Sequence, residues 1–270
     1  GTGGGIRNVY DKLRNDTVMV FNGDVLSGMD LEGILTTHHD KDADVTMHLL
    51  NVADPRAFGC VPTDSNGRVT AFLEKTEDPP TNQINAGCYV FKRSVIESIP
   101  ANRVVSVERE TFPGLLEEGR LVVGHVDNSY WRDMGRPDDF TRGSSDLVRG
   151  IAPSPLIEGK TGESLVDPSA GIAGGVLLLS GTAVGRGSEV GAGSRLEGTV
   201  VFDGVRIEPG AIIHNSIIAS GAHIGANAVI ENCVIGEGAH IGARCELLDG
   251  MRVFPGVSIP DAGVRFSSDA

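Results

Sequence analysis

Hydrophobic and polar residues alternate over the first 150 positions in the way expected of strands and helices that follow one another. The apolar run 17–21 (TVMVF) predicts a short buried strand. Behind Asp30, apolar residues recur at helical spacing and predict a helix that this aspartate caps. One face of that helix carries Leu31, Ile34, Leu35 and His38. Further strands are expected at 45–52, 68–73 and 88–91, and further helices at 106–117 and from Pro137 towards Gly150.

Beyond residue 170 the pattern changes to one apolar residue every five or six positions. These positions are Val184, Val190, Leu196, Val201, Ile207, Ile213, Ile218, Ile224, Ile230, Ile235, Ile241, Leu247, Val253 and Ile259. A small residue stands two positions before most of them, as at the corners of a triangular solenoid. The spacing predicts coils of 17 residues, between four and five in number. A glycine-rich antiparallel sheet with fortuitous spacing is the alternative.

The two patterns divide the chain into three parts. Strands alternating with helices predict an α/β domain over 1–150, with ligands at the carboxyl ends of the strands. Residues 151–170 are rich in proline and glycine and predict a linker. The repeats predict a solenoid over 171–270.

Composition excludes several classes of protein. The sequence has 270 residues, is 40% hydrophobic and carries a formal net charge of −13, which argues against nonspecific binding to nucleic acid. No apolar run approaches the length that spans a membrane. The cysteines Cys60, Cys88, Cys233 and Cys245 form no C-x-x-C pair, so we expect reduced thiols and a cytoplasmic protein.

Two aspartates are candidate ligands of a metal ion. Asp24 follows the predicted strand 17–21 and stands beside Gly23, where a carboxylate at a strand end is well placed to hold a metal. Asp133 lies in the segment YWRDMGRP, ahead of a helix start at Pro137. Together they would hold the Mg²⁺ that phosphoryl and nucleotidyl transfer need. The alternatives are a solvated tight turn at Asp24 and a structural loop with an Arg–Asp pair at Asp133.

Between these segments lie residues suited to a phosphorylated sugar. Lys75 is a candidate cation for the sugar phosphate, although a lysine at a strand end is more often a solvated charge. Glu74 and Asn85 are candidates for hydrogen bonds to sugar hydroxyls. Gly59 and Gly87 would let backbone groups approach the ligand.

Taken in order, these segments resemble the sugar-1-phosphate nucleotidyltransferases, and most closely those of the mannose-1-phosphate guanylyltransferase type from actinobacteria. The matching stretches are GTGGG at 1–5, FNGD at 21–24, FGCV at 58–61, EK at 74–75, NAGCYVF at 85–91 and WRDMGRPDDF at 131–140. The repeats resemble the left-handed parallel β-helix of hexapeptide-repeat proteins. The resemblance therefore implies a partial Rossmann-like α/β catalytic domain over 1–150, its C-terminal part, followed by a left-handed β-helix.

The resemblance also implies roles for individual residues. Asp24 and Asp133 match the metal-binding pair, and Lys75 matches the contact to the sugar phosphate. The hexose would be bound by Glu74, Asn85 and Gly87. The nucleobase and ribose would touch a glycine-rich loop that contains Gly1, Thr2 and Gly3.

This sequence departs from the family pattern at two places. Thr76 stands where family members usually have proline after the Glu–Lys pair. The glycine-rich loop with arginine and lysine that cradles the triphosphate is not among these residues. We therefore expect the 270 residues alone to be inactive, with exposed strand edges near 17–21.

The implied reaction is transfer of a nucleotidyl group from an NTP to a sugar 1-phosphate, with GTP, mannose 1-phosphate and Mg²⁺ favoured. The resemblance also implies a cytoplasmic homo-oligomer, with the β-helix as the candidate interface. The alternative substrates are dTTP or UTP with glucose 1-phosphate. A noncatalytic regulatory or assembly subunit of the same family is a second reading. A hexapeptide-repeat acyltransferase is a third, because His214, His223 and His240 lie in the repeats.

Overall fold

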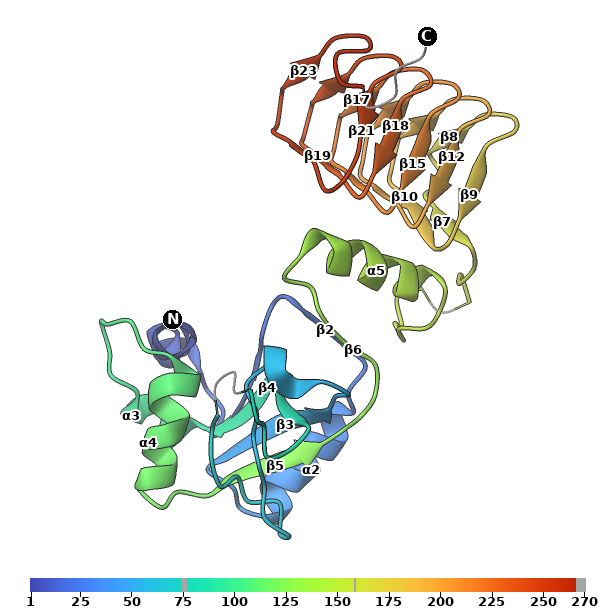
Figure 1. The fold of residues 1–270 in the computed structure, drawn as a ribbon. Coiled ribbons are helices and arrows are strands. Elements are labelled where there is room, and N and C mark those ends of the chain that lie inside the picture. Colours follow the sequence, from blue (N-terminus) through green and yellow to red (C-terminus); the bar gives the residue numbers. More distant parts are fainter. Residues whose placement is uncertain (74–76, 158, 266–270) are drawn as a thin grey trace. The chain divides into compact units, whose positions relative to one another are not determined.

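The computed structural model describes residues 1–73, 77–157 and 159–265. By its internal contacts the chain divides into two compact units, Gly1–Trp131 and Arg132–Ala270 (Figure 1). Among the described residues, no helix is long and apolar enough to cross a membrane.

The first unit is built on a mixed sheet in which the described residues form strands in the order β1-β4-β3-β5. These strands are β1 (Thr17–Phe21), β3 (Val45–Asn51), β4 (Gln83–Lys92) and β5 (Val122–Val126). β4 is antiparallel to both of its neighbours, whereas β3 and β5 are parallel. The carboxyl ends of β1, β3 and β5 therefore lie at the edge of the sheet where β4 begins. The α/β class predicted from the sequence is confirmed.

Short helices and strands complete this unit. They are α1 (Thr2–Asn8), η1 (Tyr10–Lys12), β2 (Val25–Ser27), α2 (Leu31–Asp40), η2 (Pro55–Ala57), α3 (Arg93–Ser98), the π-helical turn η3 (Val107–Thr111), α4 (Phe112–Glu117) and β6 (Trp131–Asp133), which crosses the unit boundary. Residues 68–73 form isolated bridges with Val123, Thr63 and Cys60 rather than the predicted strand.

Two predictions about burial are wrong in detail. β1 was expected to be buried, but it is the edge strand of the sheet, and Phe21 is 54% exposed. In α2, Asp30 caps the helix by accepting a hydrogen bond from the Glu32 N–H at 3.0 Å, as predicted. Ile34 and His38 are buried there, but Leu31 is 47% exposed because it begins the first turn, outside the packed face.

The segment Gly1–Gly5 is not the loop that the sequence suggested. Gly1 is the N-cap of α1, and the following glycines lie in its first turns. The glycines are needed because this helix packs against the backbone of 103–106. A Cβ atom at Gly1 would lie 2.5 Å from the carbonyl oxygen of Val105, and one at Gly4 would lie 2.8 Å from that of Arg103.

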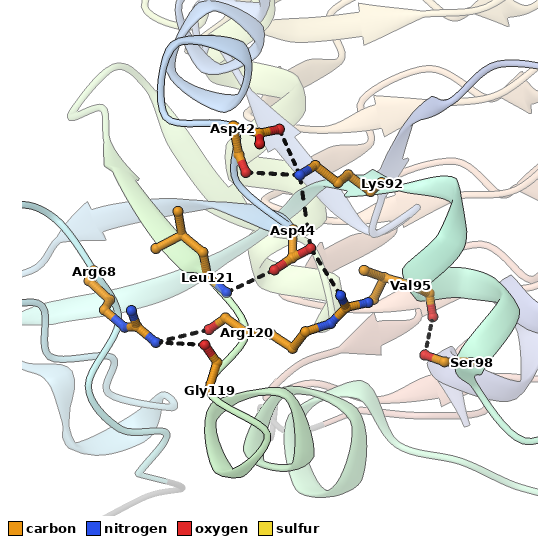
Figure 2. A network of polar contacts seen from close by, with 9 residues as sticks. All are labelled: Asp42, Asp44, Arg68, Lys92, Val95, Ser98, Gly119, Arg120 and Leu121. Carbon is orange, nitrogen blue, oxygen red and sulfur yellow. Dashed lines mark hydrogen bonds and ion pairs between the residues drawn. The ribbon is translucent and has the colours of Figure 1, made fainter.

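Asp44 ties three strands together at the edge of the sheet opposite the strand ends described above (Figure 2). Its Oδ2 accepts a hydrogen bond from the Leu121 N–H at 2.9 Å, ahead of β5. Its Oδ1 lies 3.5 Å from the Arg120 guanidinium and 4.0 Å from Nζ of Lys92, at the end of β4. Lys92 also pairs with Asp42 at 2.7 Å. The carboxylate thus helps to hold β3, β4 and β5 in register.

From Ser164 to residue 265 the second unit is a parallel β-solenoid of about six turns, with each turn hydrogen-bonded to the next. One face consists of β7 (Ser164–Val166), β10 (Thr182–Val184), β13 (Val200–Val201), β16 (Ile217–Ile218), β19 (Val234–Ile235) and β22 (Arg252–Val253). The next consists of β8 (Gly171–Ile172), β11 (Glu189–Val190), β14 (Arg206–Ile207), β17 (His223–Ile224), β20 (His240–Ile241) and β23 (Ser258–Ile259). The last consists of β9 (Leu177–Leu179), β12 (Arg195–Glu197), β15 (Ile212–His214), β18 (Val229–Glu231) and β21 (Glu246–Leu247).

The predicted repeat matches the register of this solenoid. Val184 pairs with Val201, and Val201 with Ile218, so equivalent positions are 17 residues apart. The solenoid has more coils than predicted, because it begins at Ser164 inside the range expected to be a linker. The left-handed sense stays a prediction from the resemblance.

The small residues at the solenoid corners are buried, and those that carry a hydroxyl group make hydrogen bonds inside the solenoid. Thr182 Oγ1 donates to the Leu196 carbonyl at 3.1 Å, and Thr199 Oγ1 donates to the Ile213 carbonyl at 3.2 Å. Ser188 donates to the Phe202 carbonyl at 2.8 Å. At these three corners the buried hydroxyl group is thus hydrogen-bonded, as buried polar groups generally are.

The helix α5 (Pro137–Val148) belongs to the same unit as the solenoid. The ring of Phe140 stacks on that of Phe202 with centroids 6.4 Å apart. Ser145 Oγ donates to the Ser180 carbonyl at 2.6 Å. The helix expected to end the α/β domain therefore packs on the outer face of the solenoid.

The burial of His38 predicts how the free energy of unfolding depends on pH. It is 2% exposed, and its Nδ1 lies 3.0 Å from Thr46 Oγ1. Burial, followed by the charges of His39 and Lys92, lowers the pKa of His38 to about 4. Between that pH and about 6.5, the unfolded chain binds a proton that the folded protein excludes. We expect the free energy of unfolding to fall by up to about 3 kcal/mol as the pH drops through this window.

Denaturant unfolding at a series of pH values measures this effect. His38→Asn should flatten the dependence on pH, since asparagine can hydrogen-bond Thr46 without titrating in this range. His39→Asn, at the exposed neighbouring position, removes one of the charges that lower the pKa of His38 but not its burial, so it should reduce the slope much less than His38→Asn does. An equal slope in wild type and His38→Asn would contradict the assignment.

Candidate functional site

The candidate site lies at the edge of the sheet where β1 ends and β4 begins. Directly after β1, Asn22, Gly23 and Asp24 form a turn. The Asp24 side chain is exposed and makes no hydrogen bond or ion pair with the described residues. A Cβ atom at Gly23 would meet nothing within 4 Å, so packing does not require glycine there. The carboxylate is thus open to a ligand from solution.

A bulge in β4 brings Gly87 against this turn. The register with β3 shifts between Met47, which pairs with Tyr89, and Leu49, which pairs with Asn85. Gly87 has a φ of +80°, and a Cβ atom there would lie 2.8 Å from Asn22 Nδ2. Its carbonyl accepts a hydrogen bond from the Asn22 N–H at 2.8 Å. Both the backbone angle and the close contact therefore require glycine.

Asn85 is held at both ends of its amide group. Its Nδ2 donates to the hydroxyl oxygen of Tyr89 at 2.7 Å, and its Oδ1 accepts from the Gly87 N–H at 3.1 Å. Its backbone N–H donates to the Gly59 carbonyl at 3.2 Å, which places Gly59 beside the bulge. The predicted sugar-binding residues Gly59, Asn85 and Gly87 are thus neighbours.

Trp131 holds the same bulge from another segment. Its indole N–H donates to the Ala86 carbonyl at 2.9 Å, and its ring lies edge-on to that of Phe58 with centroids 5.7 Å apart. The Gly28 N–H donates to the Tyr130 carbonyl at 2.8 Å, which attaches the segment before β6 to the segment after β2. The sequence marked this tryptophan as the single one in the chain but gave it no role.

The remaining predicted residues belong to other elements. Asp133 is exposed at the end of β6, in the second unit, and its Oδ1 accepts a hydrogen bond from the Gly135 N–H at 3.0 Å. Gly1, Thr2 and Gly3 are in the first turn of α1, where Gly3 is buried against Val105. Glu74 and Lys75 lie outside the described residues.

Two of the three histidines considered for acyl transfer, His223 and His240, are neighbours on one face of the solenoid, whereas His214 is on another. Nδ1 of His223 lies 2.8 Å from Nδ1 of His240, and Nε2 of His223 lies 3.2 Å from Glu208. The His223 hydrogen bond lowers the pKa of Glu208. His214 is half-buried, and its Nε2 is buried without a partner among the described residues.

The chain thus combines a sheet that has a carboxylate turn and a glycine bulge at its edge with a parallel β-solenoid that follows it in the sequence. A family model described as nucleotidyl transferase matches residues 1–150, and one described as GMPPB C-terminal domain matches residues 160–263. The chain belongs to the nucleotidyl transferase family.

Individual relatives match over different lengths. Mannose-1-phosphate guanylyltransferase of Mycobacterium tuberculosis is 65% identical over 270 residues, 100% of this chain and 75% of that protein. Mannose-1-phosphate guanylyltransferase 1 of Arabidopsis thaliana is 35% identical over 205 residues, 73% of this chain and 56% of that protein. Mannose-1-phosphate guanyltransferase of Neurospora crassa is 33% identical, over 64% of this chain and 50% of that protein. The chain thus spans about half the length of the plant and fungal relatives.

Proposed function

We propose that the protein transfers a guanylyl group from GTP to mannose 1-phosphate and forms GDP-mannose and pyrophosphate. The observation that carries this proposal is the 65% identity, along the whole chain, to a protein named mannose-1-phosphate guanylyltransferase. In the reaction a phosphate oxygen of the sugar bonds to the α-phosphorus of GTP. The bond from that phosphorus to the bridging oxygen breaks, and pyrophosphate leaves with the electron pair.

Asp24 and Asp133 are the proposed ligands of a divalent metal ion, with Mg²⁺ expected. Both carboxylates are exposed, and Mg²⁺ is commonly held by one or two carboxylates together with substrate phosphates. The residues present therefore fit the ion. When bound, it would neutralise charge on the phosphate oxygens and on the departing pyrophosphate.

The bulge of β4 supports a role in binding the sugar. One N–H of the Asn85 side-chain amide donates to Tyr89, and the other is proposed to donate to a sugar hydroxyl. Gly59 and Gly87 lie beside it and stay proposed contacts of the sugar, and Glu74 and Lys75 are proposed to contact the hexose and its phosphate. Because the nucleophile is already an anion, these residues contribute by positioning it. Gly1, Thr2 and Gly3 stay proposed contacts of the base and ribose.

Pyrophosphate release by the intact protein tests this proposal. With Mg²⁺, we expect turnover with GTP and mannose 1-phosphate, and much less with dTTP or UTP and glucose 1-phosphate. Preference for the second pair would overturn the choice of substrates. No turnover with any pair would favour a noncatalytic subunit, and turnover of acetyl-CoA would favour an acyltransferase.

Lys75 gives a prediction specific to the sugar phosphate. Lys75→Ala should raise the KM for mannose 1-phosphate by about tenfold or more, because a charge-assisted hydrogen bond to the phosphate is lost. The KM for GTP should change much less. Steady-state kinetics with each substrate varied in turn measure both, and Lys160→Ala, at an exposed position of the second unit, is the control. Equal effects on both KM values would contradict the role.

Assembly and location also stay predictions. We propose a cytoplasmic homo-oligomer, with the solenoid as the candidate interface.

A further inference from the structure

Tyr89 carries a hydroxyl group in the middle of the aromatic core of the first unit. The side chain is 0% exposed, and its ring centroid lies 5.1 Å from that of Phe112 and 6.0 Å from that of Phe91. Phenylalanine would fill the same space in this apolar cluster. The hydroxyl group therefore has to be explained by what it binds.

That hydroxyl group binds the side chain of Asn85. The 2.7 Å contact to Nδ2 fixes which end of the amide faces the core. Burial raises the pKa of Tyr89, so the group stays neutral and accepts this hydrogen bond throughout the physiological pH range.

The orientation of Asn85 in turn shapes the bulge. With Nδ2 directed at Tyr89, Oδ1 is directed at the Gly87 N–H and accepts from it at 3.1 Å. Gly87 then presents its carbonyl to Asn22, two residues before Asp24. A chain of hydrogen bonds thus runs from the core hydroxyl group to the turn that carries the candidate metal ligand.

We propose that Tyr89 is a positioning residue, which orients Asn85 and the Gly87 bulge for recognition of the sugar phosphate; this inference rests on the proposed function. Tyr89 itself does not touch substrate. Without its hydroxyl group the Asn85 amide is held only by the hydrogen bond from the Gly87 N–H to Oδ1, and the fraction of molecules with the correct orientation falls.

Kinetics of Tyr89→Phe test the proposal. We expect the KM for mannose 1-phosphate to rise about three- to tenfold, the loss expected for one neutral hydrogen bond, while the KM for GTP changes by less than about twofold. Tyr10→Phe removes a tyrosine hydroxyl group elsewhere in the unit and should leave both values unchanged. A Tyr89→Phe enzyme with unchanged KM values, or with both raised equally, would overturn the proposal.

A double-mutant cycle shows whether Tyr89 acts through Asn85. Asn85→Ala should raise the KM for mannose 1-phosphate by itself. Because Tyr89 then has no amide to orient, adding Tyr89→Phe to Asn85→Ala should change the KM no further. A full additional effect in the double variant would mean that Tyr89 acts by another route and would contradict the proposal.

A measurement without substrate separates this inference from the proposed function. In Tyr89→Phe the side-chain amide signals of Asn85 in a ¹H–¹⁵N spectrum should move, and the Gly87 amide hydrogen should exchange faster. Unchanged signals would overturn the role of Tyr89 even in an enzyme that makes GDP-mannose. Shifted signals in a protein that makes none would support the hydrogen-bond chain, and the proposed function would be what failed.

Discussion

Asp24→Asn is expected to lower kcat by about 10²-fold or more, which is the scale of losing one well-placed electrostatic contact in a transition state. Asparagine keeps the size of the side chain but removes the negative charge that a divalent metal needs. The melting temperature should barely move, because the side chain is exposed and makes no hydrogen bond or ion pair with the described residues. Loss of activity would then come from the site and not from the fold.

Pyrophosphate release at saturating GTP, mannose 1-phosphate and Mg²⁺ measures this effect, and Asp133→Asn should behave in the same way. Asp40→Asn, at the exposed end of α2, is the matched control and should retain full activity. Near-normal turnover of Asp24→Asn at saturating Mg²⁺ would show that this carboxylate is not a metal ligand.

The sequence was sufficient to predict the solenoid because its period is local. Each inward residue pairs with its equivalent one coil away, so the spacing in the sequence is the register in space. The first coil was missed because Pro168 and its glycine neighbours suggested a linker. In the structure, Val166 and Ile172 continue the same column of residues ahead of Val184 and Val190, with proline and glycine at the corner between them.

The candidate site was predictable in part. The stretches FNGD and NAG were found because glycine and carboxylate in short segments are conspicuous in a sequence. The partners that hold them were missed for two reasons. The sequence pattern does not distinguish Tyr89 from the apolar residues of the same strand. Trp131 is 45 positions away along the chain from Ala86, whose carbonyl accepts its hydrogen bond. The loop expected at 1–5 was wrong because glycine suggested flexibility, whereas these glycines allow a helix to pack closely against 103–106.

Two neighbouring isoleucines on β15 test the register of the solenoid. Ile213 is 0% exposed and points into the column of inward residues, whereas Ile212 is 40% exposed on the outer surface. We expect Ile213→Asp to destabilise the solenoid by at least about 4 kcal/mol, because it buries an unpaired charge among apolar side chains. Ile212→Asp should change its stability by no more than about 0.5 kcal/mol, because the new carboxylate remains in water.

Thermal or denaturant unfolding followed by circular dichroism compares the two variants, which differ by a single step along one strand. Since each coil stacks only on its neighbours, the loss of structure at Ile213 should extend first to the two strands that pair with β15, which are β12 and β18. Limited proteolysis of Ile213→Asp should therefore cut first within these coils, whereas Ile212→Asp should resist the protease as wild type does. Equal stability of the two variants, or the reverse order, would mean that the side chains of β15 face the other way and that the 17-residue register is wrong.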